Sequence, residues 1–293
     1  MIELMGVMPP IVTPFEDDAV SLAKLKENLK KWNQTDLSGY LVLGSNGEAV
    51  YLNEKEKLSV VETSRNIIPS SKIMLVGTGM ESTIETIRFT NQVADLGADF
   101  ALIITPSYFK GSMKPQVLYD HFISIAESSL IGILIYNVPQ FTGINMEPEL
   151  VARLSKHPNI VGVKDSSGNI GQLSEIINLS QKGFAVFVGS ASVFFSALCI
   201  GAVGGILAVA NVVPQECVKI QQLFNEGKFD KAREIQNLMT PLAKGVTVQY
   251  GIGGLKMAMD IAGYFGGKPR PPLKRPDQGV EEELKQLLLP LKS

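Results

Sequence analysis

A lysine stands where an apolar strand is expected to end, in the segment IVGVKDSSGN at 160–169. The residues from Ile160 to Val163 favour a strand that is buried on both faces. A lysine is rarely buried unless it is paired or has a task. These residues alone leave two interpretations open: Lys164 ends a strand as an ordinary lysine paired with Asp165, or its amine is a catalytic group.

Tyr136 ends the apolar run that precedes this segment, and it offers a second reactive group. If Lys164 lies among apolar walls, its charged form is disfavoured and the free amine becomes available. Such an amine attacks a ketone and forms a Schiff base, which acts as an electron sink. A nearby phenol could move a proton to and from the substrate oxygen. Packing of Tyr136 as an ordinary aromatic side chain is the alternative.

A glycine-flanked turn, GSNGE at 44–48, follows another apolar run. Its backbone N–H groups and the side chains of Ser45 and Asn46 suit a carboxylate, because the turn leads into a predicted helix. A short glycine motif is equally typical of a simple tight turn.

Eight apolar runs must position these groups, and they recur at intervals of roughly 20 to 34 residues. The intervening segments mostly favour helices, including 21–34 and 53–68, which begin on serine and asparagine caps, and 81–97, which ends on glycine. Strands that alternate with helices predict an α/β fold with a parallel sheet, and eight units favour a closed (β/α)8 TIM barrel. The alternative fold is an open, doubly wound sheet. No G-x-G-x-x-G follows the first run, so the dinucleotide-binding version of that fold has no support. The runs begin at residues 6, 39, 73, 100, 131, 160, 184 and 204.

The carboxyl ends of the strands should form the functional face of such a barrel. Hydroxyls, two tyrosines and one lysine are expected there, which indicates a small-molecule site. Beyond about residue 214 only helices are predicted. We therefore divide the chain into a barrel at 1–225 and a C-terminal helical region at 226–293. The polar residues expected at the strand ends are Thr13, Ser45, Asn46, Glu48, Thr78, Thr105, Ser107, Tyr108, Tyr136, Asn137, Lys164, Asp165, Ser166, Ser190 and Asn211.

The composition narrows the classes of partner. The 293 residues are 45% hydrophobic and 19% charged with a net charge of −2, and no basic stripe predicts a nucleic-acid partner. The apolar runs are shorter than the roughly 20 residues of a membrane span, so no membrane partner is expected. Two cysteines are too few for a disulfide framework and fit a cytoplasmic location. Two histidines without a second ligand nearby do not predict a metal site.

Four segments in order, GSNGE, TPSYF, YNVPQFTG and VGVKDSSG, resemble the dihydrodipicolinate synthase / N-acetylneuraminate lyase family of Schiff-base pyruvate aldolases. The resemblance extends over the whole chain. It implies a (β/α)8 barrel with C-terminal helices and a carbon–carbon lyase whose only cofactor is a covalent lysine imine. It also implies pyruvate or another 2-oxo acid as the small-molecule partner, and a homotetramer built as a dimer of dimers.

The resemblance also implies roles for particular residues. Lys164 would be the Schiff-base lysine and Tyr136 the proton-transfer tyrosine, while Tyr108 would reach across a dimer interface into the neighbouring site. Asn46 can hydrogen-bond but is neither an acid nor a base, so a full proton relay through this position does not carry over. The implied substrate-binding residues are Ser45, Asn46, Ser166, Ile206, Gly189 and Thr142.

Departures from the family bear on the substrate. Phe141 stands where the synthase has an arginine for the carboxylate of aspartate semialdehyde, and GSAS at 189–192 lacks the acid with which the sialic acid lyase holds its sugar. Ser166 could bind a 4-hydroxyl, and Lys110 is the nearest candidate cation for a distal carboxylate. The segments are most similar to 4-hydroxy-2-oxoglutarate aldolases.

The predicted function is therefore cleavage of a 4-hydroxy-2-oxo acid, such as 4-hydroxy-2-oxoglutarate or 2-keto-3-deoxy-gluconate, to pyruvate and an aldehyde. Two alternatives remain open. One is dihydrodipicolinate synthase, which condenses pyruvate with aspartate semialdehyde. The other is a non-catalytic sensor that binds pyruvate without turnover.

Overall fold

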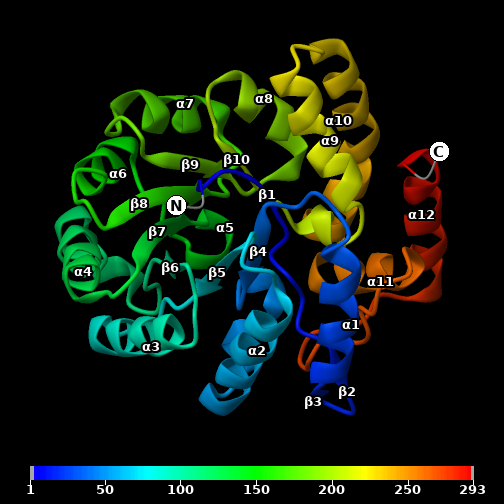
Figure 1. Cartoon of the computed structure of the whole chain (residues 1–293), viewed down its shortest axis with the longest axis horizontal. Helices are drawn as coiled ribbons and strands as arrows, with labels where there is room; N and C mark the ends of the chain where they lie inside the picture. Colours follow the sequence, from blue (N-terminus) through cyan, green and yellow to red (C-terminus); the bar gives the residue numbers. More distant parts are fainter. Residues whose placement is uncertain (1–2, 292–293) are drawn as a thin grey trace.

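Eight parallel strands form the barrel at the centre of the computed structural model, which describes residues 3–291 (Figure 1). A parallel bridge between Pro10 and Leu41 joins the two edge strands. The Leu41 N–H donates to the Pro9 carbonyl, and the Ile11 N–H donates to the Leu41 carbonyl, both at 2.9 Å. The predicted (β/α)8 TIM barrel is confirmed. Around the ring the order is β1 (Gly6–Met8), β10 (Gly204–Ile206), β9 (Ala185–Val188), β8 (Ile160–Asp165), β7 (Gly132–Asn137), β6 (Phe100–Ile104), β5 (Ile73–Gly77) and β4 (Gly39–Val42).

Helices follow the strands and cover the outside of the barrel (Figure 1). Two expected caps are confirmed: the Ser21 hydroxyl accepts from the Lys24 N–H, and Asn53 forms a reciprocal capping box with Glu56. A short helix, α5 (Pro139–Thr142), ends at Gly143 with φ +66°. The outer helices are α1 (Leu22–Trp32), α2 (Glu54–Ile67), α3 (Thr83–Asp95), α4 (Pro115–Ser128), α6 (Pro148–Leu154), α7 (Ile170–Leu179), α8 (Phe194–Cys199) and α9 (Pro214–Asn225).

One hairpin was not predicted. Strands β2 (Phe15–Glu16) and β3 (Ala19–Val20) pair antiparallel directly after the first barrel strand. The two residues between them, Asp17 and Asp18, have φ values of +49° and +61°. Left-handed conformations at both positions suit a two-residue hairpin turn, and aspartate tolerates them better than most residues do.

The barrel strands separate two apolar layers because successive side chains point to opposite faces. The outer layer joins the strands to the helices and forms the larger core. The inner layer is smaller and fills the barrel itself. Its buried members are Met8, Leu41, Ile73, Leu75, Leu102, Leu134, Tyr136, Val138, Ala185, Phe187 and Ile206.

The C-terminal helices lie on one side of the barrel, beside α1 and α9 (Figure 1). They are α10 (Phe229–Lys244), α11 (Gly251–Ile261) and α12 (Gln278–Leu288), with a π-helical turn at Gly245–Gln249. Leu242, Leu255 and Leu284 from these helices belong to the outer core of the barrel. The division at residue 225 therefore stays a prediction, and residues 1–2 and 292–293 of the two predicted domains lie outside the described part.

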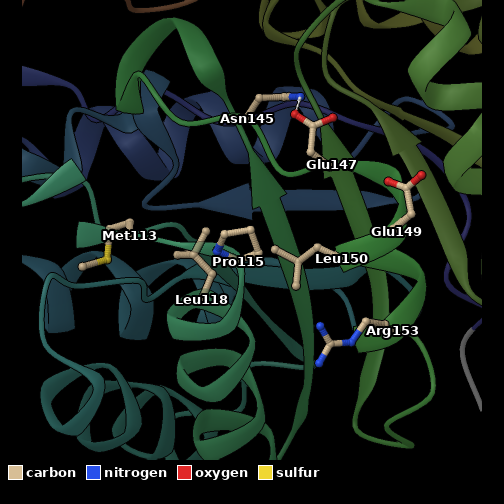
Figure 2. A pocket seen from close by; sticks show the side chains of 8 residues that line it. All are labelled: Met113, Pro115, Leu118, Asn145, Glu147, Glu149, Leu150 and Arg153. Atoms are coloured by element: carbon tan, nitrogen blue, oxygen red, sulfur yellow. Dashed lines mark hydrogen bonds between the residues drawn. The ribbon is translucent and has the colours of Figure 1, made fainter. Parts of the chain in front are cut away.

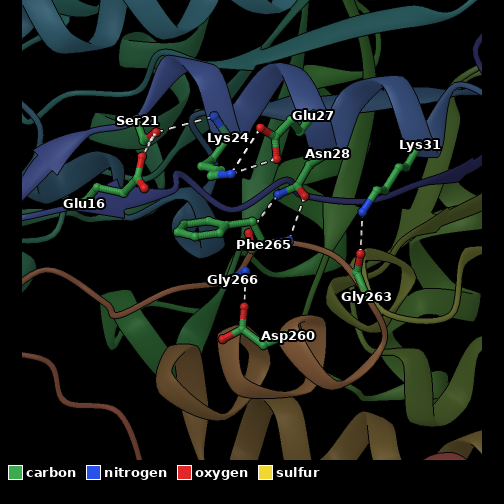
Figure 3. A network of polar contacts seen from close by, with 10 residues as sticks. All are labelled: Glu16, Ser21, Lys24, Glu27, Asn28, Lys31, Asp260, Gly263, Phe265 and Gly266. Atoms are coloured by element: carbon green, nitrogen blue, oxygen red, sulfur yellow. Dashed lines mark hydrogen bonds and ion pairs between the residues drawn. The ribbon is translucent and has the colours of Figure 1, made fainter.

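Helix α1 fastens the segment that follows α11, as Figure 3 shows. The Asn28 side chain accepts from the Phe265 N–H and donates to the Phe265 carbonyl, both at 2.8 Å. Lys31 Nζ donates to the Gly263 carbonyl at 2.5 Å. These bonds fix the C-terminal helices against the barrel. Within residues 3–291 no helix is long and apolar enough to cross a membrane.

Candidate active site

Lys164 lies inside the barrel, between two aromatic side chains. In the strand register it is opposite Tyr136 on β7 and opposite Phe187 on β9. Its side chain is only 3% exposed, and Nζ lies 4.2 Å from the centroid of the Tyr136 ring. The register therefore brings together the two residues that the sequence picked out for Schiff-base chemistry.

Asp165 does not neutralise this lysine. It comes next on the strand, so its side chain points to the opposite face. Its carboxylate accepts from Asn137 Nδ2 at 2.7 Å, from the Ser167 hydroxyl at 2.5 Å and from Gln172 Nε2 at 3.0 Å. Among the residues that the structure describes, Lys164 forms no ion pair, so the alternative of a Lys164–Asp165 pair is wrong.

Gly189 lets the groups around Lys164 approach closely. A methyl group at this position would lie 1.8 Å from Ser166 Oγ and 3.1 Å from Lys164 Cε, so any side chain would collide with them. The Gly189 N–H donates to the Asp165 carbonyl at 2.6 Å, and the Ser166 N–H donates to the Asn137 carbonyl at 2.8 Å. Ser166 and Gly189 are thus packed directly beside the lysine.

The Ser45–Gly47 turn lies across the barrel mouth from Lys164. It follows β4, which is the fourth strand from β8 in either direction around the ring. Because all eight strands are parallel, the turn and Lys164 are at the same end of the barrel. Ser45 and Asn46 are partly exposed, whereas Gly47 is buried. Ile206, on the inner face of β10, is fully buried.

Two predicted residues lie apart from Lys164 or are already engaged. Tyr108 is 81% exposed, and its ring meets the edge of Phe109 at 5.0 Å. The Tyr108 loop is fixed by Glu81, whose carboxylate accepts from the Tyr108 N–H at 3.0 Å. The buried Thr142 hydroxyl lies 3.2 Å from the Val138 carbonyl oxygen and 3.0 Å from the Ile144 carbonyl oxygen, so its proton is shared between these two backbone acceptors.

The loop after β6 approaches the loop after β7 through Lys110. A methyl group at Gly143 would lie 3.7 Å from Lys110 Nζ, so the ammonium group rests against the end of α5. Phe141, on the same short helix, is 65% exposed. A cation and an exposed ring therefore border the same rim of the barrel.

Sequence reasoning missed a second buried lysine, Lys256 on α11. Its side chain is 0% exposed, and Nζ lies 2.6 Å from Oε1 of Glu48, the last residue of GSNGE. Burial lowers the pKa of Lys256, while the carboxylate of Glu48 acts in the opposite direction. A lysine within the apolar helical run GGLKMAM at 253–259 is a signal that could have identified Lys256 as buried, although not its partner.

Two cavities of the structure lie away from these groups. A cavity of about 230 Å³ lies between α4 and α6, where Asn145 and Glu147 are hydrogen-bonded at its edge (Figure 2). A second cavity of about 550 Å³ adjoins the start of α9. Neither is lined by Lys164, so we assign the site from the strand ends. No group of three His, Cys, Asp or Glu side chains within residues 3–291 is arranged to hold a metal ion.

Comparison with known proteins identifies the family. Residues 3–290 match the Dihydrodipicolinate synthetase family. The 4-hydroxy-tetrahydrodipicolinate synthase of Methanothrix thermoacetophila is 37% identical over 286 residues, which cover 97% of this chain and 95% of that protein. A protein of Emericella nidulans named "Probable 4-hydroxy-2-oxoglutarate aldolase, mitochondrial" is 33% identical over 96% of this chain and 93% of its own length.

Solved structures agree with this assignment. The dihydrodipicolinate synthase of Thermotoga maritima superposes with a TM-score of 0.95 at 30% identity, and the match covers 99% of each chain. The dihydrodipicolinate synthase of Aquifex aeolicus superposes with a TM-score of 0.93 at 28% identity, covering 99% of this chain and 98% of the other. The chain thus belongs to the dihydrodipicolinate synthetase family, whose members are lyases and synthases that form a Schiff base between a lysine and pyruvate.

Proposed function

We propose that Lys164 is the residue that forms the Schiff base with pyruvate. The observation that carries this proposal is that the Lys164 amine is buried over the Tyr136 ring. Within the described residues this amine has no anion beside it. The amine adds to C2 of pyruvate, water leaves, and an iminium ion forms. Loss of a proton from C3 then gives an enamine, the carbon nucleophile of a condensation and the product of a cleavage.

The remaining groups around the barrel mouth suit the other needs of this reaction. The N–H groups and side chains of Ser45 and Asn46 bind the pyruvate carboxylate from the side of the barrel mouth that lies across from Lys164. The Tyr136 phenol moves protons to and from the substrate oxygen. Ser166 and Gly189 line the lysine side, and Ile206 offers its backbone carbonyl.

We infer that the aldehyde condensed with pyruvate, or the 2-oxo acid that is cleaved, carries a carboxylate at its far end. Phe141 stands where the resemblance places the arginine of the synthase, but Lys110 brings an ammonium group against Gly143, which follows the short helix that carries Phe141. Aspartate semialdehyde and 4-hydroxy-2-oxoglutarate both carry such a carboxylate. The terminal hydroxymethyl end of 2-keto-3-deoxy-gluconate does not.

Condensation of pyruvate with aspartate semialdehyde becomes our first candidate activity. Several curated relatives carry the name 4-hydroxy-tetrahydrodipicolinate synthase, at 37%, 36% and 36% identity for three of them. These names favour the synthase over the aldolase that the sequence suggested first. Cleavage of 4-hydroxy-2-oxoglutarate is the second candidate, favoured by Phe141, by Ser166 and by the relative named as an aldolase.

A panel of substrates separates the candidates. Purified protein is supplied with pyruvate plus aspartate semialdehyde, and separately with 4-hydroxy-2-oxoglutarate, 2-keto-3-deoxy-gluconate or sialic acid. Pyruvate consumption in the first reaction, or pyruvate release in the others, is followed with lactate dehydrogenase. Turnover with a carboxylated partner supports the proposal. Pyruvate binding without turnover of any partner would instead identify a sensor.

Lys110→Met tests the distal cation, with Lys114→Met as the matched control on the same loop. Loss of a charge-assisted bond should raise the KM for the carboxylated partner by about tenfold or more, with pyruvate affinity unchanged. An equal effect of both variants would show that Lys110 has no specific role.

A second copy of the chain is proposed to complete each site through Tyr108, which is exposed here. In a homotetramer built from dimers, Tyr108 would enter the neighbouring site. Mixed dimers of Lys164→Ala and Tyr108→Phe subunits contain one site with both native residues, so co-refolding the two weak variants should restore activity. Sedimentation gives the oligomeric state, and failure of the mixture to exceed either variant would contradict the exchange.

A further inference from the structure

The buried pair of Glu48 and Lys256 joins the C-terminal helices to the Ser45–Gly47 turn. Lys256 Nζ lies 2.6 Å from Glu48 Oε1 and donates to the Thr13 carbonyl at 2.8 Å and the Lys268 carbonyl at 3.2 Å. It also lies 4.4 Å from the centroid of the Phe15 ring. The ammonium group thus has three oxygen partners in a site that water does not reach.

Two residues bonded to Lys256, Thr13 and Glu48, connect it to the Ser45–Gly47 turn. Thr13, whose carbonyl binds Lys256, donates its hydroxyl to the Gly47 carbonyl at 2.6 Å. The second carboxylate oxygen of Glu48 accepts from the Arg270 N–H at 2.8 Å. Lys256 therefore holds the turn directly through Glu48 and indirectly through Thr13.

The backbone of the turn needs such support. Glu48 has φ +54°, a left-handed conformation that residues other than glycine adopt at a cost. Gly47 has little room, because a methyl group there would lie 3.0 Å from the Ile11 carbonyl oxygen. The pair therefore fixes the residue at which the backbone leaves the turn.

We propose that Glu48 and Lys256 are positioning residues that hold the Ser45–Gly47 turn in the geometry needed to bind the carboxylate of pyruvate. This inference rests on the proposed function of the turn. Neither residue contacts pyruvate in this account, because both are buried behind the turn. Their loss should weaken pyruvate binding while leaving the chemistry at Lys164 intact once pyruvate is bound.

Stability alone is a poor explanation for this pair. A buried ion pair is often no more stabilising than apolar side chains of similar volume. What apolar side chains could not supply is the set of directed bonds to Thr13, Glu48 and, through Glu48, Arg270. The variants must therefore distinguish a role in stability from a role in positioning the turn.

The test uses Lys256→Met, which keeps the volume of the side chain, with Arg275→Met as the matched control. Arg275 pairs with Asp260 at the end of the same helix and donates to the Gly267 carbonyl, away from the turn. Two quantities are measured in the full-length protein. One is the pyruvate concentration that gives half-maximal borohydride trapping at Lys164. The other is hydrogen exchange of the Gly47 and Glu48 amides without pyruvate.

We expect Lys256→Met to raise the half-saturating pyruvate concentration by about tenfold to a hundredfold, with full trapping at saturation. Exchange at Gly47 and Glu48, whose N–H groups bind the carbonyls of Gly44 and Ser45, should also become faster. Arg275→Met should change neither quantity. Unchanged pyruvate affinity and unchanged exchange in Lys256→Met would overturn the inference.

The double variant Glu48→Gln with Lys256→Met guards against a trivial loss of folding, because it leaves no lone buried charge. It should regain thermal stability relative to Lys256→Met without regaining pyruvate affinity. Recovery of both together would show that the pair has a purely structural role and would overturn the inference. If the wild-type protein traps no pyruvate, the proposed function fails, while the exchange measurement still decides whether the pair holds the turn.

Discussion

Two buried lysines with opposite surroundings occupy two regions of this molecule. Lys164, at the end of β8, is 3% exposed, and Lys256, on α11, is 0% exposed. Lys256 has a carboxylate and two carbonyl oxygens around its ammonium group. Lys164 has the face of the Tyr136 ring and the close packing of Ser166 and Gly189.

The difference shows that burial by itself does not identify a reactive amine. The carboxylate of Glu48 opposes the effect of burial on the pKa of Lys256, and an ammonium group that is engaged with three oxygen atoms offers no lone pair for attack on a carbonyl. A buried amine without an anion is the less stable arrangement, and such arrangements are typical of functional sites. The two lysines should therefore respond in opposite ways to the same substitution.

The largest expected effect is on activity when Lys164 is replaced by methionine. Without the amine no Schiff base forms, so turnover should fall by at least about a thousandfold. Thermal stability should stay the same or rise, because an apolar side chain suits this buried position better than an amino group without an anion beside it. The coupled pyruvate assay and a melting curve measure the two effects. Retained turnover would break the distinction between the lysines.

Lys256→Met should show the reverse pattern in stability. Removing one partner of a buried ion pair leaves the carboxylate of Glu48 uncompensated, which typically costs about 3–5 kcal/mol. Urea denaturation of Lys256→Met and Lys164→Met under the same conditions provides the comparison. If Lys256→Met is as stable as the wild type, Glu48 and Lys256 do not form the pair described.

His121 tests whether burial also disfavours the charged form of a histidine. The expected change in the free energy of unfolding is smaller than for Lys256→Met. Burial lowers the pKa of His121 from 6.5 to about 4, against a weaker opposing effect of Glu81. Between these values only the unfolded chain takes up the proton, so the free energy of unfolding falls as the pH falls. From pH 7.5 to pH 4 this contribution is about 3 kcal/mol.

Urea unfolding of His121→Asn across this pH range should show a correspondingly weaker pH dependence than the wild type. His157→Asn replaces the only other histidine and serves as the control. An unchanged slope in His121→Asn would show that burial does not suppress its protonation.

The smallest effect is expected for an exposed lysine. Lys285 pairs with Glu281 on the surface of α12 at 3.1 Å. Exposed pairs of this kind contribute little, so Lys285→Met should keep the melting temperature within about one degree of the wild type. A shift comparable to that of Lys256→Met would mean that burial of the pair does not matter.

The barrel and the burial of Lys164 could be predicted from the sequence, because both leave local signals. The apolar runs and the helix caps at Ser21 and Asn53 are contiguous patterns, and a lysine directly after such a run is conspicuous. The β2–β3 hairpin was missed because Asp17 and Asp18 lack the glycine that usually signals such a turn.

The role of Lys256 could not be predicted in the same way. Its acceptor at Thr13 is 243 residues away in the chain, and only the folded structure brings the two together. The partners of Asp165 also depended on the fold. Strand alternation explains why adjacent residues point to opposite faces, but Asn137 and Gln172 become neighbours only in the folded barrel.

The most direct test of the distinction between the two lysines is reductive trapping. The wild-type protein is incubated with pyruvate and borohydride, digested, and its peptides are weighed by mass spectrometry. We predict a reduced pyruvyl adduct on the peptide that contains Lys164, and none on the peptide that contains Lys256. An unmodified Lys164, or an adduct on Lys256, would contradict the assignment.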